Sequence, residues 1–225
     1  MSHHLWLIIW VSLKVALCTT LLVTIFSIAA APLLVRPRWL IIKALELLIY
    51  VPMAMPPVAL GYGLLLALGP RSAVGSFFHE TLGLRIAFSL GGAVLASFMA
   101  SVGIGLRSLR VALEQIDEGQ GHVAALLGAT KIKIYFHIIL PQCRSAIFAG
   151  AILVFIRALG EFGATLIFAG NSLGETRTLA LAIWLGIETP GRERESAVLV
   201  LMAALISLIA LIGAELFLVK NKEIK

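Results

Sequence analysis

The chain has 225 residues, of which 60% are hydrophobic and only 13% are charged, and its mean hydropathy is +1.02. Because a soluble domain normally carries about twice this charged fraction, the composition excludes an ordinary water-soluble globule. The formal net charge of +6 would suit a nucleic-acid-binding protein, but in so apolar a chain it indicates basic loops on one side of a membrane.

Four uncharged stretches are each long enough to predict a membrane-spanning helix. The hydrocarbon core of a bilayer is about 30 Å thick, so a helix crosses it with roughly 20 apolar residues. The uncharged stretches are residues 15–35, 47–70, 86–106 and 196–214. A fifth apolar stretch is interrupted by Arg157 and Glu161, and it can span only if both charges are tolerated inside the membrane.

We therefore expect an all-α polytopic membrane protein with about five transmembrane helices in a single domain, residues 1–225. The first apolar stretch lacks a basic flank and is too long for the core of a secretory signal, so we interpret it as an uncleaved span. The expected spans cover about residues 5–35, 45–69, 86–106, 145–169 and 196–218.

The basic residues predict the orientation of the chain, since cytoplasmic loops are enriched in Lys and Arg. One set of connecting segments holds eleven basic residues, namely Arg36, Arg38, Lys43, Arg107, Arg110, Lys131, Lys133, Arg144, Lys220, Lys222 and Lys225. The opposite set holds five, namely Arg71, Arg85, Arg177, Arg192 and Arg194. This imbalance predicts an external N-terminus and a cytoplasmic C-terminus.

The second expected span contains Pro52, Pro56 and Pro57. Proline removes a backbone donor and frees a carbonyl in mid-span, so this helix must bend or lean on its neighbours. A moving gate and a static kink are equally compatible with the pattern.

The only sizeable polar stretch is residues 107–144, which we expect to be a cytoplasmic helical loop. Apolar residues recur at helical intervals on both sides of Gly128, which predicts two short helices hinged near that glycine. Pro141 is expected to start or break the next helix. Such a helix pair is a candidate docking surface.

The fourth expected span carries Arg157 and Glu161, four residues apart and hence on one helix face. Charges at membrane depth are costly and usually mark a pathway. The alternative is a self-neutralising ion pair that only positions neighbouring helices. The segment that follows, residues 171–194, has a single short apolar piece, so we expect an external re-entrant or interfacial half-helix there.

The polar loop resembles the EAA loop of bacterial ABC-importer permeases. That pattern is Glu-Ala-Ala, three residues, Gly, nine residues and Ile-x-Leu-Pro, and the spacing from Gly128 to Pro141 matches it, with His122 at the Glu position. In that family the loop inserts into a cytoplasmic ATPase, so the resemblance implies a separate subunit that binds ATP and Mg, with no cofactor in this chain. The residues implied in coupling are His122, Ala124, Ala125, Gly128, Ala129, Ile138, Leu140 and Pro141. An ordinary amphipathic loop is the alternative.

Three segments resemble the molybdate ABC-transporter permease family. They are Arg157-Ala-Leu-Gly-Glu-Phe-Gly-Ala-Thr165, Gly174-Glu-Thr-Arg-Thr178 and the proline-rich Val51–Tyr62. The resemblance implies a type I ABC importer permease in the bacterial inner membrane. It also implies a homodimer, two ATPase subunits and a periplasmic or lipid-anchored oxyanion-binding protein.

We therefore expect the permease subunit of an ATP-driven molybdate importer that works by alternating access and is not itself an enzyme, since no Walker motif occurs in the sequence. Tungstate, sulfate or thiosulfate are alternative substrates, and an ATP-independent oxyanion channel or carrier is a more remote alternative. Hydroxyl and cationic side chains suit an anion pathway, whereas Glu161 suits a structural or gating role. The candidate pathway and gate residues are Pro56, Pro57, Arg157, Glu161, Thr165, Asn171, Thr176 and Arg177.

Overall fold

The computed structural model describes residues 2–35 and 40–222, and the regular structure of this part of the chain is helical throughout. The helices are α1 (Ser2–Leu34), α2 (Leu40–Ala54), α3 (Pro57–Leu68), α4 (Ala73–Leu82), α5 (Leu90–Glu114), α6 (Glu118–Leu126), α7 (Lys131–Ile134), the π-helix η1 (Tyr135–Ile139), α8 (Leu140–Gln142), α9 (Arg144–Leu159), α10 (Gly163–Ala169), α11 (Leu179–Glu188) and α12 (Glu193–Lys222). The expectation of an all-α fold is confirmed.

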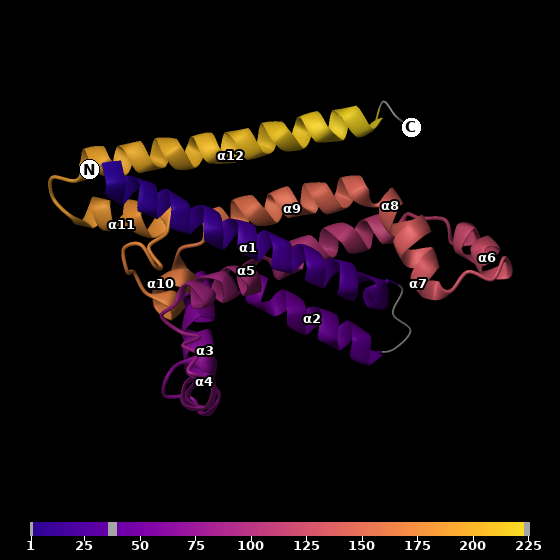
Figure 1. The fold of residues 1–225 in the computed structure, drawn as a ribbon, viewed down its shortest axis with the longest axis horizontal. Helices are drawn as coiled ribbons and strands as arrows, with labels where there is room; N and C mark the ends of the chain where they lie inside the picture. Colours follow the sequence, from indigo (N-terminus) through magenta and orange to yellow (C-terminus); the bar gives the residue numbers. More distant parts are fainter. Residues whose placement is uncertain (1, 36–39, 223–225) are drawn as a thin grey trace.

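Three long helices, α1, α5 and α9, pack against one another along the long axis of the molecule (Figure 1). Helix α2 packs on α5, α10 packs on α3 and α5, and α12 lies against α9 and α11. The side of α5 that faces the core is lined with small residues such as Ala93, Ala96 and Ala100. Small residues let helix backbones approach closely, which is how membrane helices gain packing contacts.

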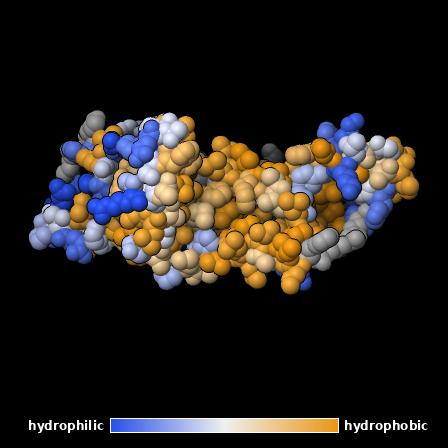
Figure 2. Space-filling model, turned by 90° about the horizontal axis from the view of Figure 1, so that it is seen from below, coloured by the Kyte–Doolittle hydropathy of each residue, from blue (hydrophilic) through white to orange (hydrophobic). Residues whose placement is uncertain are grey.

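The start of α1 and the end of α12 lie toward opposite ends of this long axis (Figure 1). Helices α6 and α7 project at the end where α12 finishes, which we call the loop end; α10 and α11 lie toward the other end, which we call the far end. Figure 2 shows a hydrophobic band between two more hydrophilic ends. A chain whose middle exposes large apolar side chains while its ends are polar fits a bilayer.

The helix lengths qualify the expectation of five simple spans. Among the described residues, three helices are by themselves long and apolar enough to cross a membrane, within His4–Leu34, Leu90–Glu114 and Glu193–Leu218. Five crossings result only when each of two bent helix pairs counts as one.

The second expected span, 45–69, is not one helix. It consists of α2 and α3, which are bent by 116° at the break between Ala54 and Pro57. Pro56 has an extended backbone, with φ −56° and ψ 133°, and Pro57 opens α3 at a position where a missing N–H costs nothing. The predicted bend is therefore a complete break, and α3 and α4 extend to one side of the bundle (Figure 1).

The fourth expected span, 145–169, is also interrupted. Helix α9 ends at Leu159, residues 160–162 are not helical, and α10 begins at Gly163. The helical segment that precedes α9, Lys131–Gln142, is bent by 71° relative to α9. Pro141 is the second residue of α8, so it lies at the start of a short helix as expected, and the bend into α9 follows at Cys143.

The third span and the polar loop have different boundaries from those expected. Helix α5 starts at Leu90, where the Ser89 hydroxyl accepts a hydrogen bond from the Gly92 N–H at 3.0 Å, and it continues to Glu114. Residues 107–114, expected in the loop, therefore belong to α5. Within this extension Arg110 forms ion pairs with Glu46 of α2 and with Glu114 of α5.

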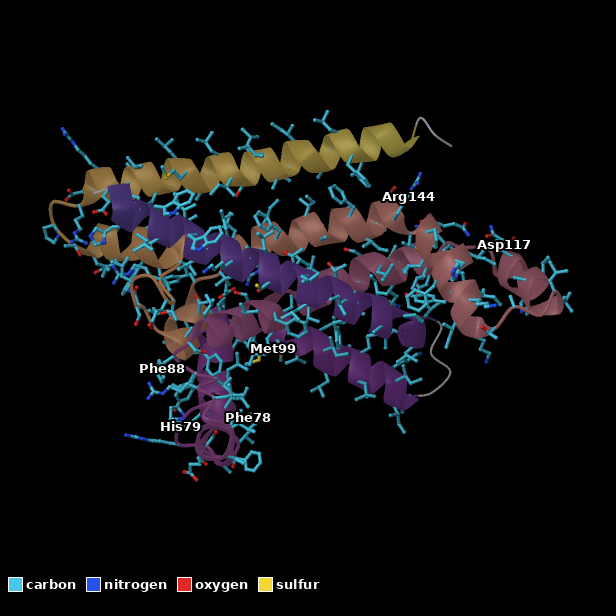
Figure 3. All side chains as sticks on the ribbon, viewed as in Figure 1. Phe78, His79, Phe88, Met99, Asp117 and Arg144 are labelled. Carbon is cyan, nitrogen blue, oxygen red and sulfur yellow. The ribbon has the colours of Figure 1, made fainter. Side chains whose placement is uncertain are left out.

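Helix α4 was not expected. Ser72 caps its N-terminus by accepting a hydrogen bond from the Gly75 N–H at 2.9 Å, and Gly83 ends it with a positive φ of 65°. Figure 3 shows Phe78 and His79 on this projecting helix, whereas Asp117 and Arg144 lie at the loop end. Of the basic residues used to predict orientation, Arg36, Arg38 and Lys225 lie outside the described residues.

Candidate functional site

The two charges of the fourth span meet at the break between α9 and α10. Arg157 Nη1 lies 2.6 Å from Glu161 Oε2, and the Glu161 side chain is 1% exposed, against 33% for Arg157. The predicted pairing is present, but not on one continuous helix face: Arg157 lies in the last turn of α9, whereas Glu161 lies in the non-helical break that follows. The pair neutralises a carboxylate that would otherwise be strongly unfavourable in a buried position.

Glu161 has a second partner. Its Oε1 atom accepts a hydrogen bond from the Ala164 N–H at 3.0 Å, in the first turn of α10. The first N–H groups of a helix have no partner within the helix, and a carboxylate there also interacts favourably with the helix dipole. Glu161 therefore holds the end of α9 and the start of α10 together, which agrees with a structural or gating role.

Several N–H groups of Arg157 make no hydrogen bond within the described part of the chain. A guanidinium has five N–H groups, and among the described residues Glu161 is the only hydrogen-bond acceptor that Arg157 contacts. The ion pair holds the other N–H groups of Arg157 in position, and the Arg157 side chain is partly exposed. This arrangement suits a transient contact with an oxyanion, because the negative partner is buried while part of the positive one is open.

The break in the second span packs against the break in the fourth. Near the α3 N-terminus, a Cβ atom built on Gly163 would lie 2.9 Å from Pro57 Cβ, and one built on Gly61 would lie 2.8 Å from Ala164 Cα. Only glycine permits these backbones to come so close. The structure thus brings Pro56 and Pro57 to the start of α10, next to the segment that Glu161 caps.

Thr165 and Thr176 are buried, and the oxygen atom of each side chain already has a hydrogen-bond partner in this conformation. The Thr165 hydroxyl donates to the Phe162 carbonyl at 2.9 Å, and Thr176 Oγ1 accepts from the Ser172 N–H at 2.9 Å. Both side chains stabilise turns beside the site.

Asn171 and Arg177 form a separate cluster. Arg177 Nε donates to Asn171 Oδ1 at 2.7 Å, and Arg177 also lines a small cavity beside Arg192, Ser196 and Ile8. In the described part of the chain, Arg157 and Arg177 share no hydrogen-bond partner. The predicted pathway residues therefore fall into two groups, one at the α9–α10 break and one at the far end beside α11.

The helical loop at the other end of the molecule has the predicted hinge. Helix α6 ends at Leu126, Gly128 has a φ of +87°, and the Ala129 N–H returns to the Ala124 carbonyl at 3.0 Å. This is the turn that commonly ends a helix at glycine. His122 and Ala125 are exposed, and two large apolar residues beside the hinge are also strongly exposed, Leu126 at 87% and Leu127 at 84%.

The second half of the loop is the segment Lys131–Gln142, which we call the arm. It contains Ile138, Leu140 and Pro141, and it is joined to α6 by a hydrogen bond of 2.7 Å from Gln142 Nε2 to Gln120 Oε1. Exposed leucines on a helix pair held in one shape form an apolar surface, which indicates a protein partner.

Two groups were missed by the sequence analysis. Glu46 on α2 is buried and pairs with Arg110 on α5, which also bonds Glu114 at 2.8 Å. The Tyr135 hydroxyl donates to the Ile28 carbonyl of α1 at 2.7 Å. A lone acidic residue at the edge of an apolar window was a signal for Glu46, but neither partner could be identified from the sequence alone.

The contact between the two breaks gives a testable expectation. Gly61→Ala should push α3 away from α10, because its Cβ would sit 2.8 Å from Ala164 backbone atoms, and overpacking of this kind costs about 1–3 kcal/mol. We expect a lower melting temperature for the purified protein in detergent. Gly63→Ala in the same helix is the control, since nothing lies within 4 Å of its Cβ. Equal melting temperatures for the two variants would contradict the close contact.

Comparison with known proteins gives a consistent result. Residues 23–219 match the family model described as binding-protein-dependent transport system inner membrane component. The molybdenum transport system permease protein ModB of Haemophilus influenzae is 39% identical over 204 residues, which cover 91% of this chain and 89% of that protein. ModB of Escherichia coli K12 is 38% identical over 210 residues, covering 93% and 92%.

Solved structures share the fold at lower identity. A chain of the MetNI methionine ABC transporter, in an inward-facing conformation, superposes with a TM-score of 0.70 at 14% identity, covering 95% of both chains. A chain of a bacterial alginate ABC transporter, solved with an alginate-bound periplasmic protein, superposes with a TM-score of 0.73 at 18% identity, covering 92% of this chain and 76% of that one. The fold is therefore that of a type I ABC importer permease.

Proposed function

We propose a function from the premise that this chain belongs to the family of binding-protein-dependent transport system inner membrane components. In this proposal the chain is the permease subunit of an ATP-driven ABC importer that carries molybdate across the inner membrane. The observation that carries it is the 39% identity to a molybdenum transport permease over nearly the whole length of both chains.

The proposed assembly contains two copies of this chain, two cytoplasmic ATPase subunits and an external oxyanion-binding protein. The exposed leucines beside Gly128 are a suitable surface for the ATPase, because an exposed apolar patch marks an interaction site and the buried core of an interface is apolar. The large apolar surfaces that α3 and α12 leave uncovered suit a second copy and lipid. A single chain has few full-length spans with which to enclose a transport pathway by itself.

The proposed mechanism is alternating access with an external N-terminus and a cytoplasmic C-terminus. Closure of the ATPase dimer moves the helical loop, and the spans that follow α1 change from inward-open to outward-open. Arg157 contacts the passing oxyanion through its unused donors, while Glu161 holds the α9–α10 break. Arg177 and Asn171 belong to the external entrance beside the docked binding protein.

Tungstate and sulfate remain the second candidates within this class. All are tetrahedral oxyanions, and a guanidinium with several free N–H groups recognises oxyanion geometry without distinguishing the central atom. In such an importer the soluble binding protein supplies most of the discrimination.

The test is uptake by proteoliposomes that contain this chain and its ATPase, with the binding protein outside. We expect molybdate uptake that requires ATP and stops when the binding protein is omitted. Excess sulfate should not compete, whereas tungstate should. Uptake without ATP would favour a channel or carrier, and uptake of sulfate but not of molybdate would change the substrate.

The docking surface gives a further expectation. Leu126→Ser combined with Leu127→Ser should weaken binding of the ATPase at least tenfold, equal to about 1.4 kcal/mol. Folding should be nearly unaffected because both side chains are exposed. Co-purification of the ATPase measures this, with the exposed far-end Leu84→Ser as the control. Full binding by the double variant would place the ATPase elsewhere.

A further inference from the structure

Within the described residues, one side-chain hydrogen bond joins the arm to α1, across 107 positions in sequence. The Tyr135 hydroxyl donates to the Ile28 carbonyl at 2.7 Å. Around this bond Tyr135 and Ile139 pack on a buried cluster that includes Ala31 and Leu34 of α1 and Leu113 of α5. The part of the loop nearest the bundle is therefore joined to the end of α1.

The Ile28 carbonyl is free to accept this bond because of Pro32. In an α-helix the carbonyl of residue 28 would accept from the N–H of residue 32, and proline has no N–H. A carbonyl left without a donor in the membrane carries a substantial cost. The Tyr135 hydroxyl therefore takes the place of the N–H that Pro32 lacks as the donor to the Ile28 carbonyl.

A second proline accounts for the shape of the arm. Pro141 cannot donate to the carbonyl of residue 137, and its ring would clash with that carbonyl in α geometry. The segment Tyr135–Ile139 instead forms a wider π turn, in which the Leu140 N–H donates to the Tyr135 carbonyl. Such turns are rare and occur frequently at functional sites.

The other end of α1 has a matching contact. Ser12 Oγ donates to the Ile8 carbonyl at 2.8 Å and accepts from the Leu179 N–H at 2.7 Å, and both bonds are buried. Leu179 is the first residue of α11, and the side chain of its N-cap residue, Thr178, makes no capping hydrogen bond. Ser12 therefore caps α11 from a different helix.

Between these contacts α1 is suited to transmit movement. Ser12 and Ile28 are 16 positions apart, about 24 Å along a helix. The intervening residues include neither Gly nor Pro, so the common causes of a kink are missing. Helices α5 and α9 pack along the same stretch and restrain its bending.

We propose that α1 is a strut that carries movement of the arm, which adjoins the ATPase-docking leucines Leu126 and Leu127, to the external half-helix α11, with Tyr135 and Ser12 as the positioning residues at its two ends. This inference rests on the proposed function, because it assigns a path for coupling between ATP hydrolysis and transport. It predicts that loss of either contact raises the amount of ATP hydrolysed per molybdate transported without unfolding the protein.

The test compares three variants in the reconstituted importer with molybdate as the substrate. Tyr135→Phe removes the donor and leaves the Ile28 carbonyl unpaired. Pro32→Ala supplies that carbonyl with a donor from its own helix. We expect Tyr135→Phe to lower the melting temperature and to raise the ATP hydrolysed per molybdate transported roughly fivefold or more, the lower end of typical coupling between sites.

The double variant Tyr135→Phe with Pro32→Ala separates positioning from stability. Its melting temperature should return toward the wild-type value, because the carbonyl is satisfied, while its ATP cost per molybdate should stay high, because the arm is still detached from α1. Tyr50→Phe is the matched control, since the buried Tyr50 hydroxyl has no hydrogen-bond partner among the described residues. It should leave the ATP cost unchanged.

The far contact has its own pair of variants. Ser12→Ala should also raise the ATP cost, whereas Thr20→Ala should not, because the Thr20 hydroxyl bonds only the Ala16 carbonyl of its own helix within the described part of the chain. A normal ATP cost in Tyr135→Phe, or its restoration in the double variant, would overturn the strut. No ATP-dependent uptake by the wild-type importer would instead overturn the proposed function, and the strut with it.

Discussion

Replacement of Arg157 with alanine is expected to abolish oxyanion uptake. Glu161 would keep its buried position and its bond to the Ala164 N–H but lose its only ion-pair partner among the described residues. Breaking a buried pair by removing one partner costs about 3–5 kcal/mol. Uptake by whole cells or proteoliposomes measures the effect, and size-exclusion chromatography tests whether assembly of the dimer partly survives.

A double variant shows which role of Arg157 matters. Arg157→Ala with Glu161→Gln removes both charges, and the glutamine oxygen can still accept from the Ala164 N–H. This variant should fold and assemble but remain inactive, because the oxyanion has lost its guanidinium contact. Arg85→Ala, which replaces an exposed arginine outside the site, is the control. Wild-type uptake by the double variant would show that Arg157 serves only to neutralise Glu161.

Gly128→Pro is expected to uncouple ATP hydrolysis from uptake. Gly128 has a φ of +87° and its N–H donates to the Ala125 carbonyl at 3.0 Å, whereas proline requires a φ near −65° and has no N–H. The turn between α6 and the arm cannot form in the variant. Uptake should fall at least tenfold, about 1.4 kcal/mol of coupling free energy, while the folded bundle persists.

The chain provides a close control for this substitution. Gly191 has the same φ of +87°, and a Cβ atom added to it would, as at Gly128, meet nothing within 4 Å, but it lies in the turn before α12 at the far end. Gly191→Pro should therefore strain a similar turn without changing the ATP hydrolysed per substrate. Unchanged transport by Gly128→Pro would rule out the hinge, and equal losses in both variants would indicate a general defect in folding.

Apolar length predicts the positions of the uninterrupted helices well, but it does not reveal where a helix is interrupted. The windows that became α1 and α12 have no break, and their positions follow from hydropathy alone. The prolines near residue 56 signalled a bend, but not the 116° that turns α3 out of the bundle. The fourth window was expected to form one span if Arg157 and Glu161 were tolerated in the membrane, but the helix is interrupted between Leu159 and Gly163.

Local pairs and turns were predictable for a physical reason. Arg157 and Glu161 meet because they are only four residues apart across the end of α9, and Gly128 takes a positive φ because few other residues can. These features depend on a handful of neighbouring residues, so the sequence by itself determined them, together with the membrane-spanning character, the helical class and the loop spacing from Gly128 to Pro141.

The tertiary structure alone decided which distant groups meet. Arg110 pairs with Glu46, which is 64 positions away in sequence, and Tyr135 donates to the Ile28 carbonyl, which is 107 positions away. The break at Pro57 lies against Gly163. Each contact depends on how several helices cross, and a helix with an apolar surface on every side does not specify its neighbour. For that reason the sequence identified the charges and the prolines, and only the packing of the helices assigned their partners.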